Sequence, residues 1–190
     1  MAEERDNSFD FDFIVVGSGF GGSVSALRLA EKGYSVAVIE RGKRWRTADF
    51  PKTNWNVRKY LWAPVVRCFG IQAITLLRDV MILHGCGVGG GSLVYANTLL
   101  IPPDRVFADP KWSALGRWKE DLAPHYVAAQ RMLGVVTAPC PTETDRMLRE
   151  IANETGRGAT YRPTEVGVFF GEPGKTVPDP YFDGRGPERT

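Results

Sequence analysis

The chain has 190 residues, of which 43% are hydrophobic and 24% are charged, so its composition fits one globular domain or part of a larger one. The formal net charge of +2 is too small to indicate a polyanionic partner by itself. The acidic start, MAEERDNSFD, is not followed by the apolar stretch of a secretory signal, and no apolar run approaches the roughly 20 residues that span a bilayer.

The cysteines and histidines limit the possible metal and redox chemistry. Cys68, Cys86 and Cys140 are odd in number and far apart, with no CxxC pair. This pattern argues against a disulfide framework and a zinc site, and it favours a reducing, cytoplasmic location. The only histidines are His84 and His125, which excludes a histidine-rich metal centre, so we expect no metal.

The N-terminal segment predicts a strand, turn, helix and strand in succession. FDFIVV, residues 11–16, is expected to form a short buried strand, because its β-branched residues run directly into glycine. The GSGFGG turn follows at 17–22, and SVSALRLAEKGY at 23–34 then predicts a helix of about three turns. SVAVIE at 35–40 predicts a second buried strand that ends in an acid. This order is typical of a Rossmann-like unit that binds a dinucleotide.

The glycines and the acid each have an expected role. Gly17 allows a tight turn, Gly19 lets a pyrophosphate approach bare backbone at the helix N-terminus, and Gly22 lets the helix pack closely on the strands. Glu40 lies where a ribose would be, and its carboxylate is expected to accept both ribose hydroxyl protons. Glu40 also argues against a 2′-phosphate on the cofactor, although the neighbouring Arg41 keeps that possibility open. A glycine turn without a ligand is the alternative, and the agreement of all four features speaks against it.

Residues 41–79 lack a clear periodicity and interleave basic side chains with Trp45, Trp55, Tyr60 and Trp62. The pattern favours a surface excursion whose aromatic side chains pack on the domain and whose basic side chains lie in solvent. A cover over a bound cofactor, or part of a substrate entrance, is the main alternative. Basic and aromatic residues also occur together in nucleic-acid-binding proteins, but no binding motif is present, so we expect no nucleic-acid partner.

A second glycine-rich stretch, VMILHGCGVGGGSLVYAN, covers residues 80–97. A strand-like apolar run leads into repeated glycines, and Ser92 then opens a segment that could begin a helix. Two glycine-rich turns in one domain indicate that the backbone approaches a long ligand at two places, because a flat ring system lying on the chain leaves no room for Cβ atoms. A helix N-terminus at 90–92 would also stabilise negative charge on a reduced flavin. A purely structural glycine loop is the alternative.

Residues 12–42 and 84–100 together resemble the N-terminal part of the glucose–methanol–choline (GMC) family of FAD-dependent oxidoreductases, and most of all its bacterial cholesterol oxidase branch. The resemblance extends over residues 10–115. It implies an α/β fold, namely a doubly wound, Rossmann-like FAD-binding domain that is incomplete in this chain and carries irregular and helical insertions. The family usually has Asn or His where this chain has Tyr95, and Asn97 could supply the missing polar contact.

The resemblance also assigns FAD-binding residues by position. The first turn would line the pyrophosphate, Glu40 and Arg41 would lie at the adenosine ribose, and the second glycine run would follow FAD towards its flavin. The assigned residues are Gly17, Ser18, Gly19, Phe20, Gly21, Gly22, Glu40, Arg41, Gly85, Gly89, Gly90, Gly91, Ser92 and Asn97. The family's catalytic histidine and its Asn or His partner lie well downstream, so we expect no catalytic residue in this chain. Cys86 is expected to be structural or a bystander, with a place close to the flavin as the alternative. His125 is expected to be an ordinary surface or boundary residue, and no catalytic role is expected for His84, because no partner acid or base can be assigned to it.

The rest of the chain predicts two helices and a strand. An amphipathic helix is expected to carry one apolar stripe, formed by Trp118, Leu122, Tyr126, Ala129 and Leu133. A second helix lies within 141–156, with Thr142 as its cap and Gly156 as its stop, and a strand is expected at 165–170.

Three parts are therefore expected. Residues 1–10 form an N-terminal tail, and 11–115 form the N-terminal part of the FAD-binding domain. Residues 116–190 form a helical and loop segment that leads into a substrate and catalytic domain absent from this chain. We also expect the 190-residue chain to fold poorly by itself, because an unfinished sheet exposes apolar faces and an open edge.

The function that the resemblance implies is oxidation of the CH–OH group of an alcohol, with a 3β-hydroxysterol such as cholesterol as the favoured substrate. Hydride would pass to flavin N5, and oxygen or another acceptor would reoxidise the flavin. One alternative is a GMC-type oxidase or dehydrogenase of another alcohol, and another is a truncated, non-catalytic FAD-binding module. An NAD-dependent dehydrogenase is the third, and the second glycine run counts against it.

Overall fold

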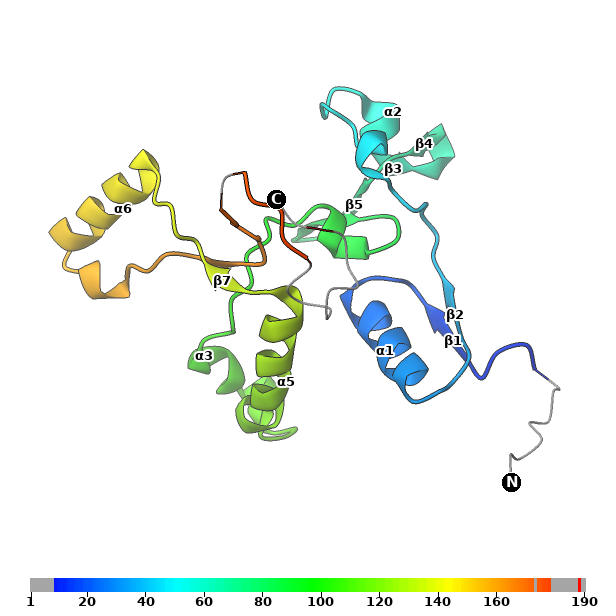
Figure 1. Ribbon diagram of the computed structural model, residues 1–190, viewed down its shortest axis with the longest axis horizontal. Helices are drawn as coiled ribbons and strands as arrows, with labels where there is room; N and C mark the ends of the chain where they lie inside the picture. The colour runs from blue at the N-terminus through cyan, green and yellow to red at the C-terminus, as the bar shows by residue number, and fades with distance from the viewer. Residues whose placement is uncertain (1–8, 173, 179–187, 189–190) are drawn as a thin grey trace. The chain divides into compact units, whose positions relative to one another are not determined.

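The computed structural model describes residues 9–172, 174–178 and 188 (Figure 1). Most of the predicted N-terminal tail and most of the glycine- and proline-rich end lie outside the described residues. The chain divides into two compact units, Met1–Ala96 and Asn97–Thr190, and each is described by itself. The predicted functional boundary at residue 115 stays a prediction, because a division by contacts does not report which residues bind a cofactor.

The first unit begins with the expected strand, helix and strand. Strand β1 covers Phe13–Val16, helix α1 Phe20–Glu31 and strand β2 Val36–Ile39. The two strands pair in parallel, from Phe13 opposite Val36 to Val16 opposite Ile39, and α1 packs on both. This arrangement confirms the Rossmann-like unit. The helix begins inside the glycine motif instead of at residue 23, because Gly19 already serves as its N-cap.

The prediction that both strands are buried is wrong for this chain. Ile14 is 63% exposed and Val16 is 84% exposed. Among the described residues only β1 and β2 belong to this sheet. A parallel sheet normally buries both faces and extends over more strands, so the apolar side chains of this pair lack their usual cover. The result agrees with an α/β domain that is incomplete in this chain.

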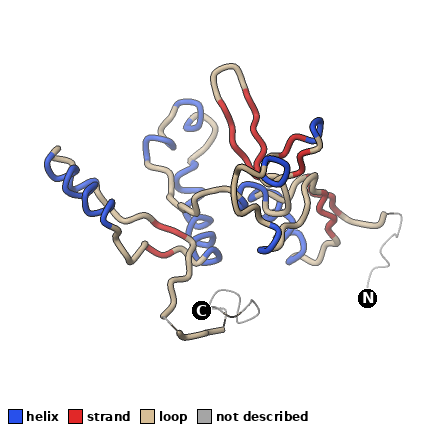
Figure 2. Tube along the Cα trace, turned by 90° about the horizontal axis from the view of Figure 1, so that it is seen from above, coloured by secondary structure: helices blue, strands red, loops and turns tan. Residues whose placement is uncertain are grey.

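Residues 41–79 contain more regular structure than their irregular pattern predicts, and the strand-like run expected before Gly85 forms β6. Strands β3 and β4 form one antiparallel pair, and β5 and β6 form another, in which Gln72 lies opposite Gly85 and Leu76 opposite Met81. These strands are among the segments drawn in red in Figure 2. The elements are η1 (Thr47–Asp49), α2 (Val57–Tyr60), β3 (Trp62–Ala63), η2 (Pro64–Val66), β4 (Cys68–Phe69), β5 (Gln72–Leu76), β6 (Met81–Gly85) and η3 (Gly90–Leu93).

The expectation of an irregular excursion up to residue 79 is therefore wrong at β5. Its sequence, QAITL, alternates apolar and polar residues only over its last three positions, which is too short for period-two patterning to reveal it. The start of β5 also contributes to the core of the described residues. Buried side chains cluster around this strand and the start of the second glycine run: Cys68, Ile71, Gln72, Ala73 and Cys86.

The second unit contains the two predicted helices and several short elements. The long helix begins at Trp118 as expected, and its half-buried residues include Trp118, Leu122 and Tyr126. Ala129 and Leu133 are exposed, so the predicted stripe is only partly covered. The elements are α3 (Asp104–Phe107), α4 (Pro110–Ser113), α5 (Trp118–Leu133), β7 (Val136–Thr137), α6 (Glu143–Glu154), η4 (Gly158–Thr160) and β8 (Glu165–Val166).

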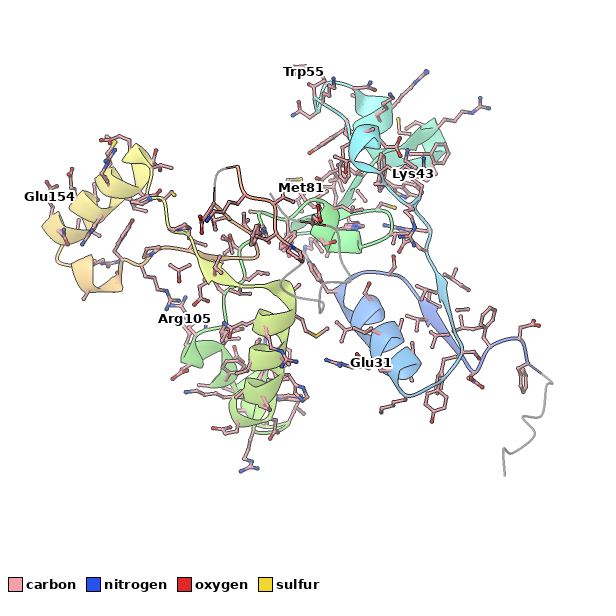
Figure 3. The ribbon with its side chains drawn as sticks, viewed as in Figure 1. Glu31, Lys43, Trp55, Met81, Arg105 and Glu154 are labelled. Carbon is pink, nitrogen blue, oxygen red and sulfur yellow. The ribbon has the colours of Figure 1, made fainter. Side chains whose placement is uncertain are left out.

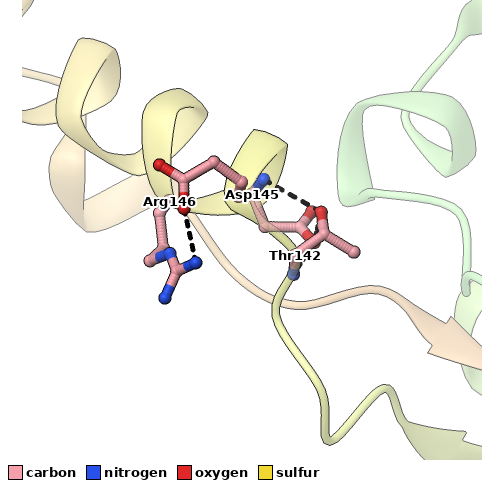
Figure 4. A network of polar contacts seen from close by, with 4 residues as sticks. Thr142, Asp145 and Arg146 are labelled. Atoms are coloured by element: carbon pink, nitrogen blue, oxygen red, sulfur yellow. Dashed lines mark hydrogen bonds and ion pairs between the residues drawn. The ribbon is translucent and has the colours of Figure 1, made fainter.

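Helix α6 has the cap that the sequence predicts (Figure 4). The Thr142 hydroxyl accepts a hydrogen bond from the Asp145 N–H, and the Asp145 carboxylate accepts from the Thr142 N–H and hydroxyl at 2.7 Å each. These hydrogen bonds lower the pKa of Asp145. Glu143 and Arg146 form an ion pair beside them. Gly156 follows the helix end, which confirms the predicted stop.

The predicted strand at 165–170 is much shorter in the structure. Only Glu165–Val166 form β8, which pairs antiparallel with β7 through Val136 and Val166. The continuation is not paired, although its apolar residues satisfy the strand pattern, because pairing depends on a partner that local sequence does not supply. None of the helices in the described part of the chain is long and apolar enough to cross a membrane.

Candidate cofactor-binding site

In the first glycine turn, residues 17–22, backbone segments pack directly against one another. Gly17 has a φ of +92°, and its N–H donates to the carbonyl of Ile39 at 2.7 Å. A Cβ atom on Gly22 would collide with the carbonyl of Gly17 and lie 3.3 Å from the Val15 side chain. The positions of Gly17 and Gly22 therefore require glycine for the reasons that the sequence predicts: a left-handed turn and a close helix–strand contact.

The N-terminus of α1 is suited to an anion. Gly19 is the N-cap and supplies no side-chain cap, and no described residue accepts from the N–H groups of Phe20, Gly21 or Gly22. Around Gly17, Gly19 and Gly21, an added Cβ would meet nothing within 4 Å. Glu31 marks the opposite end of this helix (Figure 3). Unpaired N–H groups at a helix N-terminus, with bare glycine backbone around them, favour a phosphate or pyrophosphate.

Glu40 lies beside this turn, and its carboxylate is already engaged. Oε2 accepts from the Ser18 N–H at 2.9 Å and from the Ser18 hydroxyl at 2.8 Å, while Oε1 accepts from the Gly42 N–H at 2.9 Å. A carboxylate offers about four acceptor positions. Glu40 therefore has room for about one further donor, although the sequence predicts that it accepts two ribose hydroxyl protons.

The Glu40 carboxyl is ionised at neutral pH. Burial raises its pKa, but hydrogen bonds from the Gly42 N–H and from the Ser18 N–H and hydroxyl lower it, as does the charge of Arg41. The lowering contributions win, and the pKa lies below its ordinary value of 4.5. An ionised carboxylate accepts hydrogen bonds and repels a 2′-phosphate, so the charge of Glu40 favours a ribose with free hydroxyls.

The second glycine run packs on the first. The Gly89 N–H donates to the Ser18 carbonyl at 3.2 Å and to the Ser18 hydroxyl oxygen at 3.3 Å. A Cβ atom on Gly90 would lie 2.7 Å from the Cα of Gly19, and one on Gly85 would collide with the Gly90 carbonyl. Part of the glycine content of residues 85–91 is thus explained by contact with the first turn, and not by contact with a ligand alone.

Gly42 and Trp45, which the sequence did not assign to the site, contact the second glycine run. A Cβ on Gly42 would collide with the backbone of Gly87, so these two glycines permit another close approach. The Trp45 indole N–H donates to the carbonyl of Cys86 at 3.1 Å, and Lys43 lies 4.0 Å from the centre of the Trp45 ring (Figure 3 labels Lys43). The Glu-Arg-Gly order after the second strand was the available signal for Gly42.

The prediction of a helix N-terminus at 90–92 is wrong. Gly90–Leu93 form a single 3-10 turn, and Gly89 and Gly90 have φ values of +106° and +56°. Such a backbone does not continue as an α-helix, so the expected helix dipole at the flavin is absent from this segment. The Ser92 hydroxyl donates to the Gly89 carbonyl at 3.0 Å and stabilises the turn.

The two aromatic residues near this turn contact each other. The ring of Phe20, the first residue of α1, meets Tyr95 edge to face with 5.6 Å between the ring centres. Gly91 accommodates the same ring, because a Cβ there would lie 3.1 Å from Phe20. Tyr95, which departs from the family pattern, therefore packs on the helix that carries the first glycine turn.

Arg41 and Cys86 lie near Glu40, and the expected position of Arg41 at the adenosine ribose stays a prediction. The Arg41 guanidinium is 5.8 Å from the centre of the Trp62 ring. Cys86 is 1% exposed, and its burial raises its pKa despite the opposing charge of Arg41, so the thiol is neutral. A neutral, fully buried thiol is consistent with the structural role expected for Cys86.

The two histidines and Asn97 are described within their own units. His84 is on β6, where its Nε2 lies 3.1 Å from the Thr75 hydroxyl, and His125 is exposed on α5. Asn97 is the first residue of the second unit, with a φ of 55°, and its contact with the flavin stays a prediction.

The fold and this site define a Rossmann-like dinucleotide-binding module. Residues 15–57 match the model of an NAD(P)-binding Rossmann-like domain. The chain is 59% identical over 186 residues to a cholesterol oxidase of Mycobacterium tuberculosis (strain ATCC 25618 / H37Rv), a match that covers 95% of this chain and 32% of the relative. A cholesterol oxidase of Acinetobacter baumannii is 48% identical over 187 residues, covering 96% of this chain and 34% of the relative.

A third relative broadens the comparison. An uncharacterized GMC-type oxidoreductase of the same Mycobacterium strain is 32% identical over 166 residues, covering 76% of this chain and 23% of the relative. The chain belongs to the GMC family of FAD-dependent oxidoreductases, in its cholesterol oxidase-like branch. It spans about a third of the length of the two cholesterol oxidases, 32% and 34%.

The residues of the site fit FAD, the cofactor of this family. The N–H groups at the start of α1 have no acceptor among the described residues, as a site for a pyrophosphate requires. Glu40 is ionised and keeps acceptor capacity for about one ribose hydroxyl. Both features concern the ADP half of the cofactor, whereas the contacts assigned to the flavin half at Ser92 and Asn97 remain predictions.

Proposed function

We propose that this chain is the cofactor-binding N-terminal part of a longer, cytoplasmic FAD-dependent oxidoreductase that oxidises the CH–OH group of a 3β-hydroxysterol such as cholesterol. The observation that carries the cofactor assignment is the N-terminus of α1, with unpaired N–H groups and bare glycine backbone, beside the ionised carboxylate of Glu40. The sterol is supported by the two cholesterol oxidases that match nearly the whole chain. The compartment is supported by the free thiols of Cys68, Cys86 and Cys140.

In this function the described residues would bind FAD and orient it. The N–H groups of Phe20, Gly21 and Gly22 would hold the pyrophosphate, and Glu40 would accept from the ribose. Bound FAD would supply the two-electron chemistry, accepting hydride from the carbinol carbon at N5 and passing electrons to oxygen or another acceptor. We assign no catalytic residue to this chain. The base that removes the hydroxyl proton is expected in the part of the protein that corresponds to the rest of the relatives.

The first test is to read the gene past the codon for Thr190. An open frame of several hundred residues, with a late histidine and an Asn or His partner, supports the proposal. The intact protein should then be purified and its cofactor extracted and identified. FAD supports the assignment, whereas a nicotinamide dinucleotide would overturn it.

The second test separates the possible substrates. Under anaerobic conditions, addition of cholesterol should bleach the flavin absorbance of the intact protein, and readmitted oxygen should restore it. Bleaching by aliphatic alcohols but not by sterols would replace the sterol with another alcohol. A flavin that no alcohol reduces would instead favour a non-catalytic FAD-binding module.

A further inference from the structure

Ser18 lies at the point where the two glycine runs and the ribose-binding acid meet. It is 5% exposed, and its backbone and side chain contact Glu40, Gly89 and Ser23. We propose that Ser18 is a positioning residue. Its hydroxyl holds the Glu40 carboxylate in the orientation that accepts the ribose, and it ties the second glycine run to the first. This proposal rests on the proposed FAD site.

The direction of the hydrogen bonds follows from the chemistry of the partners. The Gly89 N–H can only donate, so the Ser18 oxygen accepts at 3.3 Å. The ionised Glu40 carboxylate can only accept, so the single Ser18 hydroxyl proton points to Oε2 at 2.8 Å. The result is an ordered chain from the Gly89 N–H through the Ser18 hydroxyl to the Glu40 carboxylate. The carboxylate charge strengthens both links.

The chain of hydrogen bonds connects segments that are far apart in sequence. Gly89 is 71 positions from Ser18, and Glu40 is 22 positions from it. The Ser18 carbonyl adds a further link, because it accepts from the Gly89 N–H at 3.2 Å. A glycine turn does not need a hydroxyl at this position to reach its conformation. The hydroxyl therefore serves the two contacts, and its removal is expected to loosen both.

Removal of the hydroxyl also changes the titration of Glu40. The charged or titratable groups that act on Glu40 or respond to it are Arg41 and Cys86, and both remain in a Ser18→Ala variant. The Ser18 hydroxyl contributes to the lowered pKa of Glu40, so its loss raises that pKa. If binding requires the ionised carboxylate, cofactor affinity then falls at a higher pH in the variant than in the wild type.

The test compares Ser18→Ala with Ser23→Ala in the intact protein. Ser23→Ala is a matched control, because the Ser23 hydroxyl also bonds in this region, donating to the Ser18 carbonyl at 2.7 Å, but it contacts neither Glu40 nor Gly89. FAD binding to the apoprotein is measured by quenching of flavin fluorescence between pH 3.5 and 8. Ser18→Ala should weaken FAD binding about tenfold at neutral pH and move its acid limit upward. Ser23→Ala should leave the acid limit unchanged.

A second measurement reports the loop directly and needs no cofactor. Hydrogen exchange of the segment 85–92 is followed by mass spectrometry in the apoprotein. Exchange should be faster in Ser18→Ala than in the wild type and in Ser23→Ala, because Gly89 loses its side-chain acceptor. If Ser18→Ala does not fold, Glu40→Gln is tested in its place. Loss of the carboxylate charge should weaken the hydrogen bonds that run from Gly89 through Ser18 to residue 40, so hydrogen exchange of the segment 85–92 should become faster.

The outcomes distinguish this proposal from the proposed function. A wild-type protein that binds FAD, with a Ser18→Ala variant of equal affinity, equal acid limit and equal exchange, overturns the role of Ser18 and leaves the FAD site in place. Unchanged exchange in Glu40→Gln overturns it as well when that variant is the one tested. A wild-type protein that binds no FAD at any pH overturns both proposals.

Discussion

An added methyl group should affect stability differently at two neighbouring glycines of helix α1. Gly21 and Gly22 are both in the first turn of the helix, so replacing either with alanine gains the same helix propensity, about 1 kcal/mol. Their surroundings differ. The Cβ of Gly21→Ala enters open space, whereas the Cβ of Gly22→Ala collides with the Gly17 carbonyl and presses on Val15.

The steric difference gives the expected magnitude. Because the propensity gain cancels between the two variants, the free energies of unfolding should differ by the cost of overpacking, about 1–3 kcal/mol. The obstacle at Gly22 is a backbone carbonyl, which cannot turn aside as a flexible side chain would, so the upper part of this range is expected. Gly21→Ala should be as stable as the wild type or more stable.

The measurement is urea-induced unfolding of the intact apoprotein, followed by tryptophan fluorescence. Using the apoprotein keeps cofactor binding, which stabilises any folded state by mass action, out of the comparison. Equal midpoints for Gly21→Ala and Gly22→Ala would falsify the close packing of α1 on the glycine turn. A loss of stability in both variants would point instead to a general intolerance of side chains at this helix start.

Three further predictions concern the acid, the helix cap and the isolated chain. Because the pKa of Glu40 lies below its ordinary value of 4.5, FAD affinity should be retained above that pH and lost as the pH falls through the lowered pKa; a fluorescence titration that shows loss near neutral pH would contradict this. Thr142→Ala should destabilise the protein by about 1 kcal/mol through loss of the α6 cap, whereas Thr144→Ala, inside the helix, should cost less; urea unfolding compares them. The isolated 190-residue chain should unfold without a sharp thermal transition, because side chains such as Val16 stay exposed in its sheet; a cooperative calorimetric peak would refute this.

Features set by neighbouring residues could be predicted from the sequence. The order of strand, glycine turn, helix and strand is visible in local composition, and the structure confirms it in β1, α1 and β2. The cap at Thr142 and the stop at Gly156 depend on residues within a few positions, so they too were correct. Such features need only helix periodicity, capping chemistry and the conformational freedom of glycine.

Features that depend on distant partners could not be predicted. Strand β5 was missed because its pairing with β6, and not its own pattern, defines it. Strands β1 and β2 were expected to be buried, yet their burial depends on neighbouring strands that their sheet lacks in the described part of the chain.

The features of the site also fall into those that neighbouring residues set and those that depend on distant partners. The glycines and Glu40 were found from their spacing, and resemblance added Ser18 to the candidates as a residue along the pyrophosphate. Only the tertiary structure turns its hydroxyl toward Glu40 and brings Gly89, 71 positions away, onto it. The physical reason is that spacing along the chain reports which backbone conformations are possible, whereas hydrogen bonds across the fold depend on how separate segments pack.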